Sequence, residues 1–238
     1  ESLESNGFRI DKQSLIDEPN AAFLSYVTGA ANEGKQLKFP DDSYPNILVF
    51  DFGAGTCDIS ILEVGKDNNG VYSKNIAISR FEKLGGNDID KLIAVDILLP
   101  QILKNSGHKV SDFRTRELNE VIIPKLLKPA EQLKIKISEA ISLKATSLVI
   151  TELALSKDYL TLGTNITIDT SKGILNLDEP RLSYTEFANI NSVFTNENEI
   201  SNTKRIENEV EFISIFNPIK SALKKAKINK DDIDYVLF

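Results

Sequence analysis

Short apolar runs mark the first third of the chain as strand-forming. Residues 47–50 are continuously apolar between polar segments, which predicts a buried central strand. Apolar residues alternate with other side chains over residues 57–62, and a further extended run covers residues 71–81. The pair Asn69-Gly70 is a favoured hairpin turn. We therefore expect three consecutive strands in an antiparallel meander, with tight turns at residues 53–55 and near Gly70.

Helical spacing then dominates. Apolar side chains recur every three or four residues from Ile89 to Leu103, which predicts a long helix that Pro100 kinks or breaks. A second helix is predicted over residues 114–138, split by Pro124 and Pro129, with an apolar side formed by Leu118, Ile122, Leu126, Leu133 and Ile137. Earlier in the chain, a short helix is predicted over residues 19–27 and ends at Gly29.

The remainder of the chain alternates between short strands and helices. The expected elements are strands at 147–151, 159–162 and 166–169, a helix at 184–194, a polar loop at 195–204, a helix that Asn217 caps and Pro218 opens, and a final strand at 234–238. In that last helix, Ile219, Leu223 and Ala226 are expected to face inward. These patterns predict a two-subdomain α/β architecture.

Charge and composition narrow the classes of function. The 28 Lys and Arg residues against 35 Asp and Glu give a net charge of −7, which disfavours binding to nucleic acid. The single Cys57 forms no disulfide framework, which favours a cytoplasmic location, and it is expected to be inert packing rather than a redox-sensitive thiol. The chain lacks a long apolar run, so no membrane span is expected. The lone His108 does not make a zinc site.

The strongest candidate for chemistry is the sequence Asp-Phe-Gly-Ala-Gly-Thr-Cys-Asp at residues 51–58. A Gly-Ala-Gly turn lets its backbone N–H groups approach an anionic phosphate, and Thr56 adds a hydroxyl. The carboxylates of Asp51 and Asp58 flank the turn and suit a hydrated Mg²⁺. The alternative is that the glycines only make a hairpin turn and the aspartates solvate it. The pattern alone leaves both interpretations open.

Three motifs in order carry a resemblance. They are Leu-Ile-Asp-Glu-Pro-Asn-Ala-Ala at 15–22, Asp-Phe-Gly-Ala-Gly-Thr at 51–56 and Leu-Gly-Gly-Asn-Asp-Ile-Asp at 84–90. Together they resemble the seventy-kilodalton heat-shock (Hsp70, DnaK-type) chaperone family. Weaker similarity continues through residues 129–134, 185–187 and 218–223. The resemblance therefore spans nearly the whole chain.

The resemblance implies the second lobe of that family's nucleotide-binding domain. The fold would be an actin-like ATPase (ribonuclease H-like) lobe with an inserted α/β subdomain. Residues 1–104 and 205–238 would form the lower, discontinuous ribonuclease H-like subdomain, and residues 105–204 the inserted upper one. The first lobe would lie before Glu1. The absence of methionine also predicts either an excised segment or a sequence from which modified methionines are missing.

Site residues carry over by position, again as implications of the resemblance. Gly53, Ala54, Gly55 and Thr56 match the second phosphate-binding loop, and Gly85 and Gly86 the loop near the sugar and phosphates. Glu131 and Lys134 match helix contacts to the nucleoside. Asp51 and Asp58 match the carboxylates that hold a metal through water, and Glu18 matches the acid that organises Mg²⁺ and the attacking water. Glu18, Asp51 and Asp58 are thus the candidate catalytic residues.

The resemblance implies ATP or ADP with Mg²⁺ as cofactors, and K⁺ as a further cation. The implied partners are the first lobe of the same protein and a co-chaperone or exchange factor, with no membrane or nucleic acid. Two departures matter: Ala54 replaces the family's middle glycine, which requires a negative φ, and Ile135 replaces an arginine that packs on adenine. The segment alone is expected to be inactive. A non-catalytic regulatory or scaffold relative, another actin-like ATPase and a sugar kinase remain alternatives.

Overall fold

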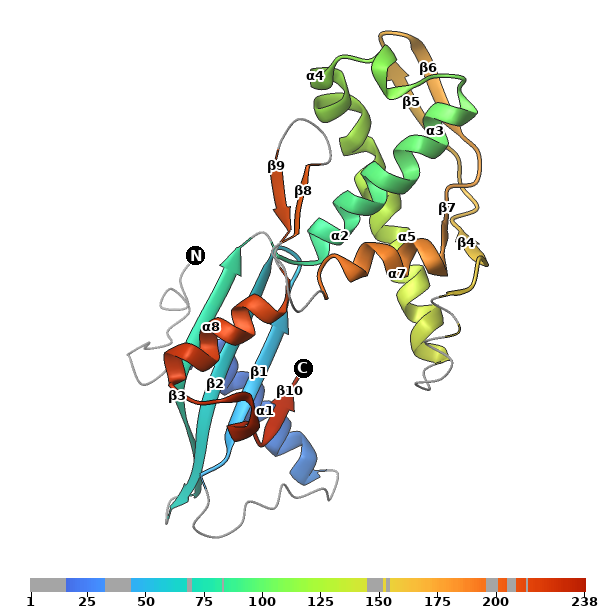
Figure 1. Ribbon diagram of the computed structural model, residues 1–238. Coiled ribbons are helices and arrows are strands. Elements are labelled where there is room, and N and C mark those ends of the chain that lie inside the picture. The colour runs from blue at the N-terminus through green and yellow to red at the C-terminus, as the bar shows by residue number, and fades with distance from the viewer. Residues whose placement is uncertain are drawn as a thin grey trace, which may run out of the picture. The chain divides into compact units, whose positions relative to one another are not determined.

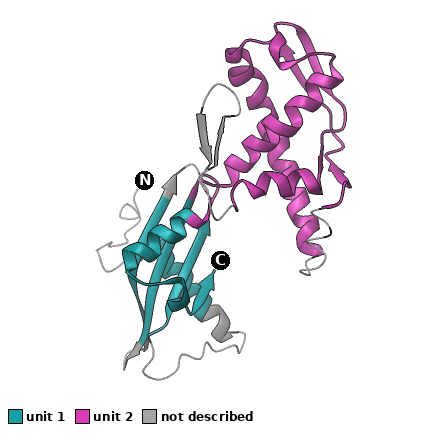
Figure 2. Ribbon diagram, in the orientation of Figure 1, with its two compact units in different colours: residues 1–52, 57–81, 217–238 teal, residues 53–56, 82–216 magenta. Residues whose placement is uncertain are grey.

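The computed structural model divides the chain into two compact units (Figure 2). Unit 1 holds residues 1–52, 57–81 and 217–238, and unit 2 holds residues 53–56 and 82–216. The structure describes residues 16–32, 44–67, 70–82, 84–144, 152, 155–195, 201–204, 209–212 and 214–238. The subdomain boundaries that the resemblance implies stay a prediction.

Unit 1 is built on a four-stranded sheet with the order β10-β1-β2-β3. Its strands are β1 (Asn46–Phe52), β2 (Thr56–Asp67), β3 (Gly70–Glu82) and β10 (Tyr235–Leu237). β1 pairs antiparallel with β2 and parallel with β10. The three predicted consecutive strands are thus confirmed as neighbours, and β1 is an interior strand, as its continuous apolar run indicates. The predicted turn residue Asn69 lies outside the described residues.

Two helices pack on opposite faces of this sheet (Figure 1): α1 (Glu18–Asn32) and α8 (Phe216–Ala226). Phe23 of α1 is fully buried in a cluster with four side chains of the sheet, namely Ile47, Val49, Leu62 and Val64. On α8 the most buried residues are Pro218 and Ala222. Because both faces of the sheet are covered, Ser60 and Leu62 of β2 are buried as well as Ile59 and Ile61.

The bounds of both helices correct the sequence prediction. α1 continues through Gly29 to Asn32, because a glycine costs a helix only about 1 kcal/mol relative to alanine and packing of Phe23 outweighs that cost. α8 begins at Phe216, before Asn217, so Asn217 is not its N-cap. The Oγ of Ser214 instead accepts a hydrogen bond from the N–H of Phe216 at 3.3 Å. The predicted inward residues Ile219, Leu223 and Ala226 are half-buried.

Unit 2 contains two long helical runs. The first consists of α2 (Gly86–Leu92), the π-helical segment η2 (Ile93–Leu98) and α3 (Leu99–Asn105). The second consists of α4 (Thr115–Glu117), the π-helical η4 (Leu118–Ile122) and α5 (Ile123–Leu143), after a 3₁₀ turn, η3 (Val110–Asp112). The apolar side predicted for the second run is confirmed, since all five of its residues are buried.

Both helical runs continue through their prolines, so the predicted split at Pro124 and Pro129 is wrong, and so is a break at Pro100, whereas a kink at Pro100 stays a prediction. Pro100 and Pro124 each stand at the start of an α-helix that follows a π-helical segment. In these wider turns the N–H of Leu99 donates to the carbonyl of Ala94, and that of Ile123 to Leu118, each five residues back. The change of register accommodates the N–H group that each proline lacks. Pro129 lies inside α5 without ending it.

Two small sheets and a further helix follow in unit 2. β4 (Tyr159–Thr161) pairs with β7 (Arg181–Ser183), and β5 (Ile166–Thr170) pairs with β6 (Gly173–Leu177), all antiparallel. α7 (Tyr184–Ser192) confirms the predicted helix, and its N-cap Ser183 accepts from the N–H of Glu186. The strand predicted at 147–151 lies outside the described residues.

A last hairpin corrects the predicted loop at 195–204. β8 (Ser201–Lys204) pairs antiparallel with β9 (Glu209–Phe212). The polar sequence Ser-Asn-Thr-Lys gives no strand signal of its own, because its backbone hydrogen bonds depend on a partner strand further along the chain. The local sequence pattern therefore did not predict this hairpin.

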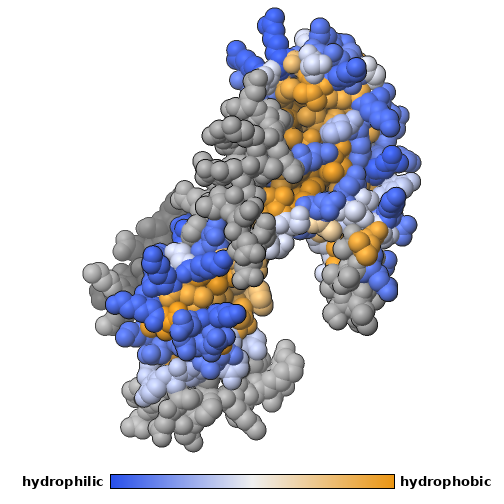
Figure 3. Space-filling view, in the orientation of Figure 1, coloured by the Kyte–Doolittle hydropathy of each residue, from blue (hydrophilic) through white to orange (hydrophobic). Residues whose placement is uncertain are grey.

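The surface of each unit is mixed in character. On the face shown in Figure 3, each unit has hydrophobic residues at its surface with hydrophilic residues around them. No helix in the described part of the chain is both long and apolar enough to cross a membrane.

Candidate functional site

The glycine turn between β1 and β2, residues 53–56, is held by the second glycine motif of the chain. The N–H of Gly86 donates to the carbonyl of Gly53 at 3.0 Å, and the N–H of Asn87 donates to the carbonyl of Ala54 at 2.6 Å. Within the turn, the N–H of Gly53 donates to the carbonyl of Thr56 at 2.9 Å. Two motifs whose hydrogen-bonded residues lie 33 positions apart in the sequence thus form one backbone arrangement in unit 2.

Close packing explains the glycine at position 85. A Cβ atom there would lie 2.6 Å from the carbonyl oxygen of Ala54 and 2.8 Å from the nitrogen of Gly55. Both contacts involve backbone atoms, which have little freedom to move away. Gly85 is therefore required so that the two backbone segments can meet.

Gly53 and Gly55 have a different basis. Neither has a φ in the left-handed region, and a Cβ at Gly55 would meet nothing closer than the Asn87 amide nitrogen at 3.8 Å. A Cβ at Gly53 would have ordinary contacts, at 3.5 Å from the Thr56 carbonyl oxygen. The fold therefore does not demand glycine at either position. Bare backbone there is what close approach of a ligand requires.

Ala54 satisfies the condition set by the sequence. Among the described residues, the non-glycine positions with positive φ are Glu179 and Lys227, so Ala54 keeps an ordinary negative φ. Ala54 and Gly55 are both exposed, and their N–H groups donate to no acceptor in the described part of the chain. Two successive free N–H groups are a donor pair of the kind that binds anions.

Lys134 of α5 joins this arrangement through Gly86. Its Nζ donates to the carbonyl oxygen of Gly86 at 3.1 Å and to Oδ2 of Asp90 at 2.8 Å. A Cβ at Gly86 would lie 3.2 Å from this ammonium nitrogen, so the glycine leaves room for it. Glu131, one turn earlier on α5, is exposed, and its charge acts on Asp90. Hydrogen bonds thus connect Gly53, Gly86 and Lys134.

The three predicted acidic residues of unit 1 share one cavity. Glu18, Asp51 and Asp58 line a space of about 610 Å³ beneath α1. Asp51 and Asp58 are register partners in the β1–β2 pair, so their side chains lie on the same face of the sheet. Glu18 is the first residue of α1. This cavity therefore brings together carboxylates from one helix and two strands.

Arg80 of β3 lines the same cavity and was not found from the sequence. Its Nε lies 3.5 Å from Oδ1 of Asp58. No local signal marks it, because only the order of the strands in the sheet brings Arg80 to Asp58. The guanidinium supplies a positive charge beside the paired carboxylates.

Cys57, which lies between Asp51 and Asp58 in the sequence, is buried and is not a reactive thiol. Burial, together with the negative charges of Asp58 and Asp51, raises its pKa to about 12. A thiol with so high a pKa carries almost no thiolate at neutral pH. The expectation of inert packing agrees with this environment.

The donor set of unit 1 fits a hydrated cation better than a fully protein-ligated one. Within the described residues, no three His, Cys, Asp or Glu side chains converge to hold a metal ion. Mg²⁺ retains several waters and is commonly held by one or two carboxylates together with phosphate oxygens. The pair Asp51 and Asp58 matches that pattern of oxygen ligands.

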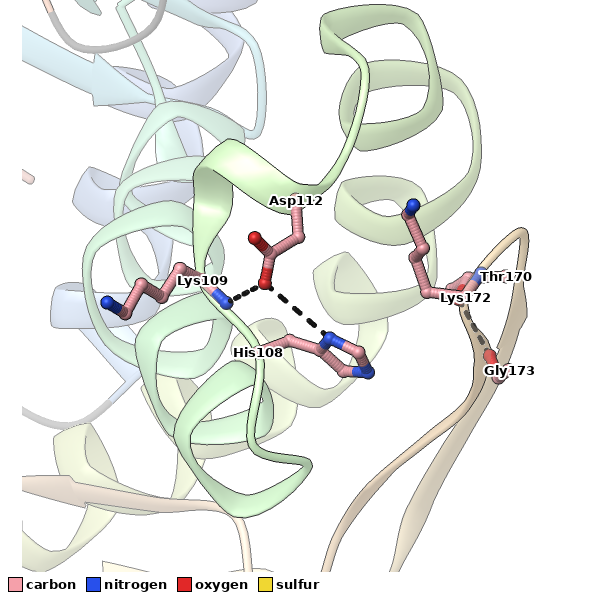
Figure 4. Close-up of polar contacts among 6 residues, drawn as sticks. All are labelled: His108, Lys109, Asp112, Thr170, Lys172 and Gly173. Atoms are coloured by element: carbon pink, nitrogen blue, oxygen red, sulfur yellow. Dashed lines mark hydrogen bonds and ion pairs between the residues drawn. The ribbon is translucent and has the colours of Figure 1, made fainter.

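The only histidine has a local structural environment in unit 2. The Nδ1 of His108 lies 3.6 Å from Oδ2 of Asp112, which also accepts from the N–H of Lys109 at 2.8 Å (Figure 4). The backbone hydrogen bond from Lys109 is the main cause that lowers the pKa of Asp112. These contacts stabilise the turn at η3.

Comparison with known proteins matches one family over most of the chain. The sequence model of the Hsp70 protein family matches residues 9–163. The chaperone protein DnaK of Thermosipho melanesiensis is 30% identical over 227 residues, which are 95% of this chain and 29% of that protein. DnaK of Trichormus variabilis is 32% identical over 94% of this chain and 24% of its own length.

The chain belongs to the Hsp70 family. Membership implies the actin-like ATPase fold, in agreement with the predicted fold class. A heat shock protein 70 homolog of Acanthamoeba polyphaga mimivirus is 29% identical over 56% of the chain. The chain spans only about a quarter of the length of the DnaK relatives that it matches.

Proposed function

We propose that this chain is the second lobe of the nucleotide-binding domain of an Hsp70-type chaperone ATPase. Residues 1–104 and 205–238 would form its lower ribonuclease H-like subdomain, and residues 105–204 the inserted α/β subdomain. Its ligands would be ATP and ADP. The first lobe of the same protein would complete the nucleotide site, and a co-chaperone or exchange factor would act on the assembled domain in the cytoplasm.

The glycine turn carries this proposal. Gly53 and Gly55 are glycines that neither φ nor packing requires, and the N–H groups of Ala54 and Gly55 are exposed donors. Glycines that the fold itself does not require are explained by a ligand that approaches the backbone closely at these positions. Phosphate is the anion class that such backbone donors recognise. Thr56 would add its hydroxyl to this loop, and Gly85 and Gly86 fix its position.

The carboxylates of unit 1 would hold the cation that accompanies the nucleotide. Asp51 and Asp58 would bind Mg²⁺ through water, and K⁺ is a further cation for the same oxygens. A bound Mg²⁺ neutralises phosphate charge during phosphoryl transfer. Glu18 would accept a hydrogen bond from the attacking water and orient it, because it lines the same cavity.

Titration of Mg-ATP tests the proposal by isothermal calorimetry. The protein at its full natural length and the 238-residue chain are measured side by side. We expect tight binding at full natural length and little or none by the chain alone, because phosphates need contacts from both lobes. Replacing Asp51 and Asp58 together by asparagine should weaken Mg-ATP binding. Absence of binding at full length, or binding indifferent to the double replacement, would refute the nucleotide and metal assignments respectively.

A second candidate is a non-catalytic scaffold member of the family. Ile135 favours it, since this side chain is 49% exposed where the resemblance places an arginine that packs on adenine. The retained set of Glu18, Asp51, Thr56 and Asp58 favours nucleotide binding instead, because a scaffold has no need of these groups. Measured ATP turnover at full natural length separates the two. The alternatives of another actin-like ATPase or a sugar kinase are less well supported, since the matched relatives are chaperones.

A further inference from the structure

Asp90 is a buried carboxylate that the predicted site does not include. It is only 6% exposed, and its Oδ2 accepts a hydrogen bond from Nζ of Lys134 at 2.8 Å. Its other oxygen, Oδ1, is buried and has no hydrogen-bond partner within the described structure. An unpaired oxygen on a buried carboxylate lowers the stability of the fold, which indicates that this carboxylate serves a purpose other than stability.

The hydrogen-bonding capacity of Lys134 indicates that purpose. A lysine ammonium has three N–H donors. Two of them are used, by Oδ2 of Asp90 and by the carbonyl of Gly86, and the side chain stays 18% exposed. One donor is therefore left for a ligand. The two partners hold the ammonium nitrogen beside the glycine turn and leave its third N–H donor unused.

We propose that Asp90 is a positioning residue that holds the ammonium of Lys134 against Gly86, so that its third donor is preset for a bound nucleotide. This inference rests on the proposed function. Asp90 itself does not touch the nucleotide, since its Oδ2 is engaged by Lys134 and its Oδ1 is buried. Presetting the lysine removes the cost of ordering a long flexible side chain at the moment of binding.

A merely structural role is the alternative. The pair joins α2 to α5, two elements that already pack against each other. In that case, loss of either partner would lower the stability of unit 2 and would leave nucleotide affinity unchanged once the protein is folded. The two roles therefore predict different results in a binding experiment.

The experiment measures the affinity of Mg-ADP for the protein at its full natural length. The variants are Asp90→Asn, Lys134→Met and the double variant, and the control is Lys136→Met. Lys136 also donates from α5 to a backbone carbonyl, that of Thr161, but has no link to Asp90. Thermal midpoints without nucleotide are recorded for each variant, so that only folded protein is compared.

We expect each single variant at the pair to weaken Mg-ADP binding by about tenfold, the usual effect of one charge-assisted hydrogen bond. The double variant should bind no more weakly than Lys134→Met, because Asp90 acts through Lys134. The control should bind as the wild type does. Effects that multiply in the double variant, or unchanged affinity in Asp90→Asn, would overturn the inference while leaving the proposed function intact. If the wild type fails to bind Mg-ADP, the proposed function fails first and the inference with it.

A pH profile gives an independent readout. Burial raises the pKa of Asp90, while the hydrogen bond and charge of Lys134 lower it and the charge of Glu131 raises it. Lys134 and Glu131, both on α5, are the charged groups that act on it. As the pH falls, protonation of Asp90 removes the charge that holds the ammonium, so affinity for Mg-ADP should decline. In Asp90→Asn the decline should be smaller, because only the contributions of ADP and of the other carboxylates of the proposed site remain, and identical profiles would contradict the proposal.

Discussion

The ammonium nitrogen of Lys134 lies 2.8 Å from the carboxylate of Asp90, although 44 residues separate them in the chain. The same nitrogen donates to the carbonyl of Gly86, whose N–H donates to the carbonyl of Gly53. A continuous series of polar contacts therefore connects a buried carboxylate on α2, a lysine on α5 and the glycine turn. Any substitution in this series is expected to act on the turn.

Gly85→Ala should destabilise unit 2, because the added Cβ would lie 2.6 Å from the backbone oxygen of Ala54. We expect a loss of about 2 kcal/mol in the free energy of unfolding, as for other overpacked sites. Gly55→Ala is the matched control and should change stability by less than about 0.5 kcal/mol. Urea unfolding measures both. Equal stability of the two variants would show that the Gly85 contact relaxes without cost.

Gly55→Ala should nevertheless impair nucleotide binding. Its Cβ would occupy the open face of the turn, where the phosphates are proposed to approach the backbone. At full natural length, we expect Mg-ATP affinity to fall by tenfold or more, with the thermal midpoint unchanged. Wild-type affinity in this variant would argue against the turn as a phosphate-binding loop.

Arg80→Gln should strengthen cation binding by the carboxylates of unit 1. The guanidinium of Arg80 competes with a metal ion for Asp58, but its side chain is 65% exposed, so the ion pair is weak. We expect about a two- to fivefold gain in affinity for Mn²⁺, used as a paramagnetic probe, and a smaller gain at high salt. Lys104→Gln, a charge change in unit 2, is the control. A gain of the same size in the control would indicate a general charge effect.

The isolated 238-residue chain should not hydrolyse ATP. Phosphoryl transfer depends on positioning and on electrostatic stabilisation from groups around the whole nucleotide, and this chain is proposed to supply only one lobe. Phosphate release in a coupled assay should equal the blank. Turnover above the blank that disappears in Asp51→Asn would contradict this prediction.

Acidification should loosen the β5–β6 hairpin of unit 2. One oxygen of Glu117 accepts from the N–H of Ser171 at 2.6 Å and the other from its hydroxyl at 2.7 Å, and these bonds lower the pKa of Glu117. A lowered folded-state pKa contributes stability that is present above the unfolded pKa and is lost as the pH falls. We expect thermal midpoints to decline less between pH 6 and pH 3 in Glu117→Gln than in the wild type. Parallel declines would exclude this contribution.

Asp17→Ala should destabilise unit 1 by about 1 kcal/mol through loss of a helix cap. Oδ1 of Asp17 accepts from the N–H of Asn20 at 3.1 Å at the start of α1, and its other oxygen accepts from the side chain of Asn75 on β3. Asp17→Asn is the matched control, because asparagine is also a good cap, and should retain most of the stability. Chemical unfolding of both variants measures the difference, and equal losses would assign the effect to the charge.

The sequence by itself determined the elements whose signals are local. The apolar run of β1, the alternation in β2 and the helical spacing of α5 follow from which side chains must leave water, and the structure confirms them. The motifs at residues 51–56 and 84–90 also identified the family before any fold was known. The roles of Glu18, Glu131 and the other site residues stay predictions.

Only the tertiary structure decided what depends on partners distant in the chain. It alone placed Asp90 on Lys134 and Arg80 beside Asp58, because strand order and helix packing, not spacing, bring these charges together. It also showed that Pro100 and Pro124 follow π-helical turns, in which the changed hydrogen-bond register accommodates the N–H group that each proline lacks. The polar strand β8 likewise exists only through its partner β9. The partners of backbone hydrogen bonds and of charged side chains come from distant parts of the chain, whereas hydrophobic periodicity can be recognised within one segment. For this reason the sequence predicted the elements but not these contacts.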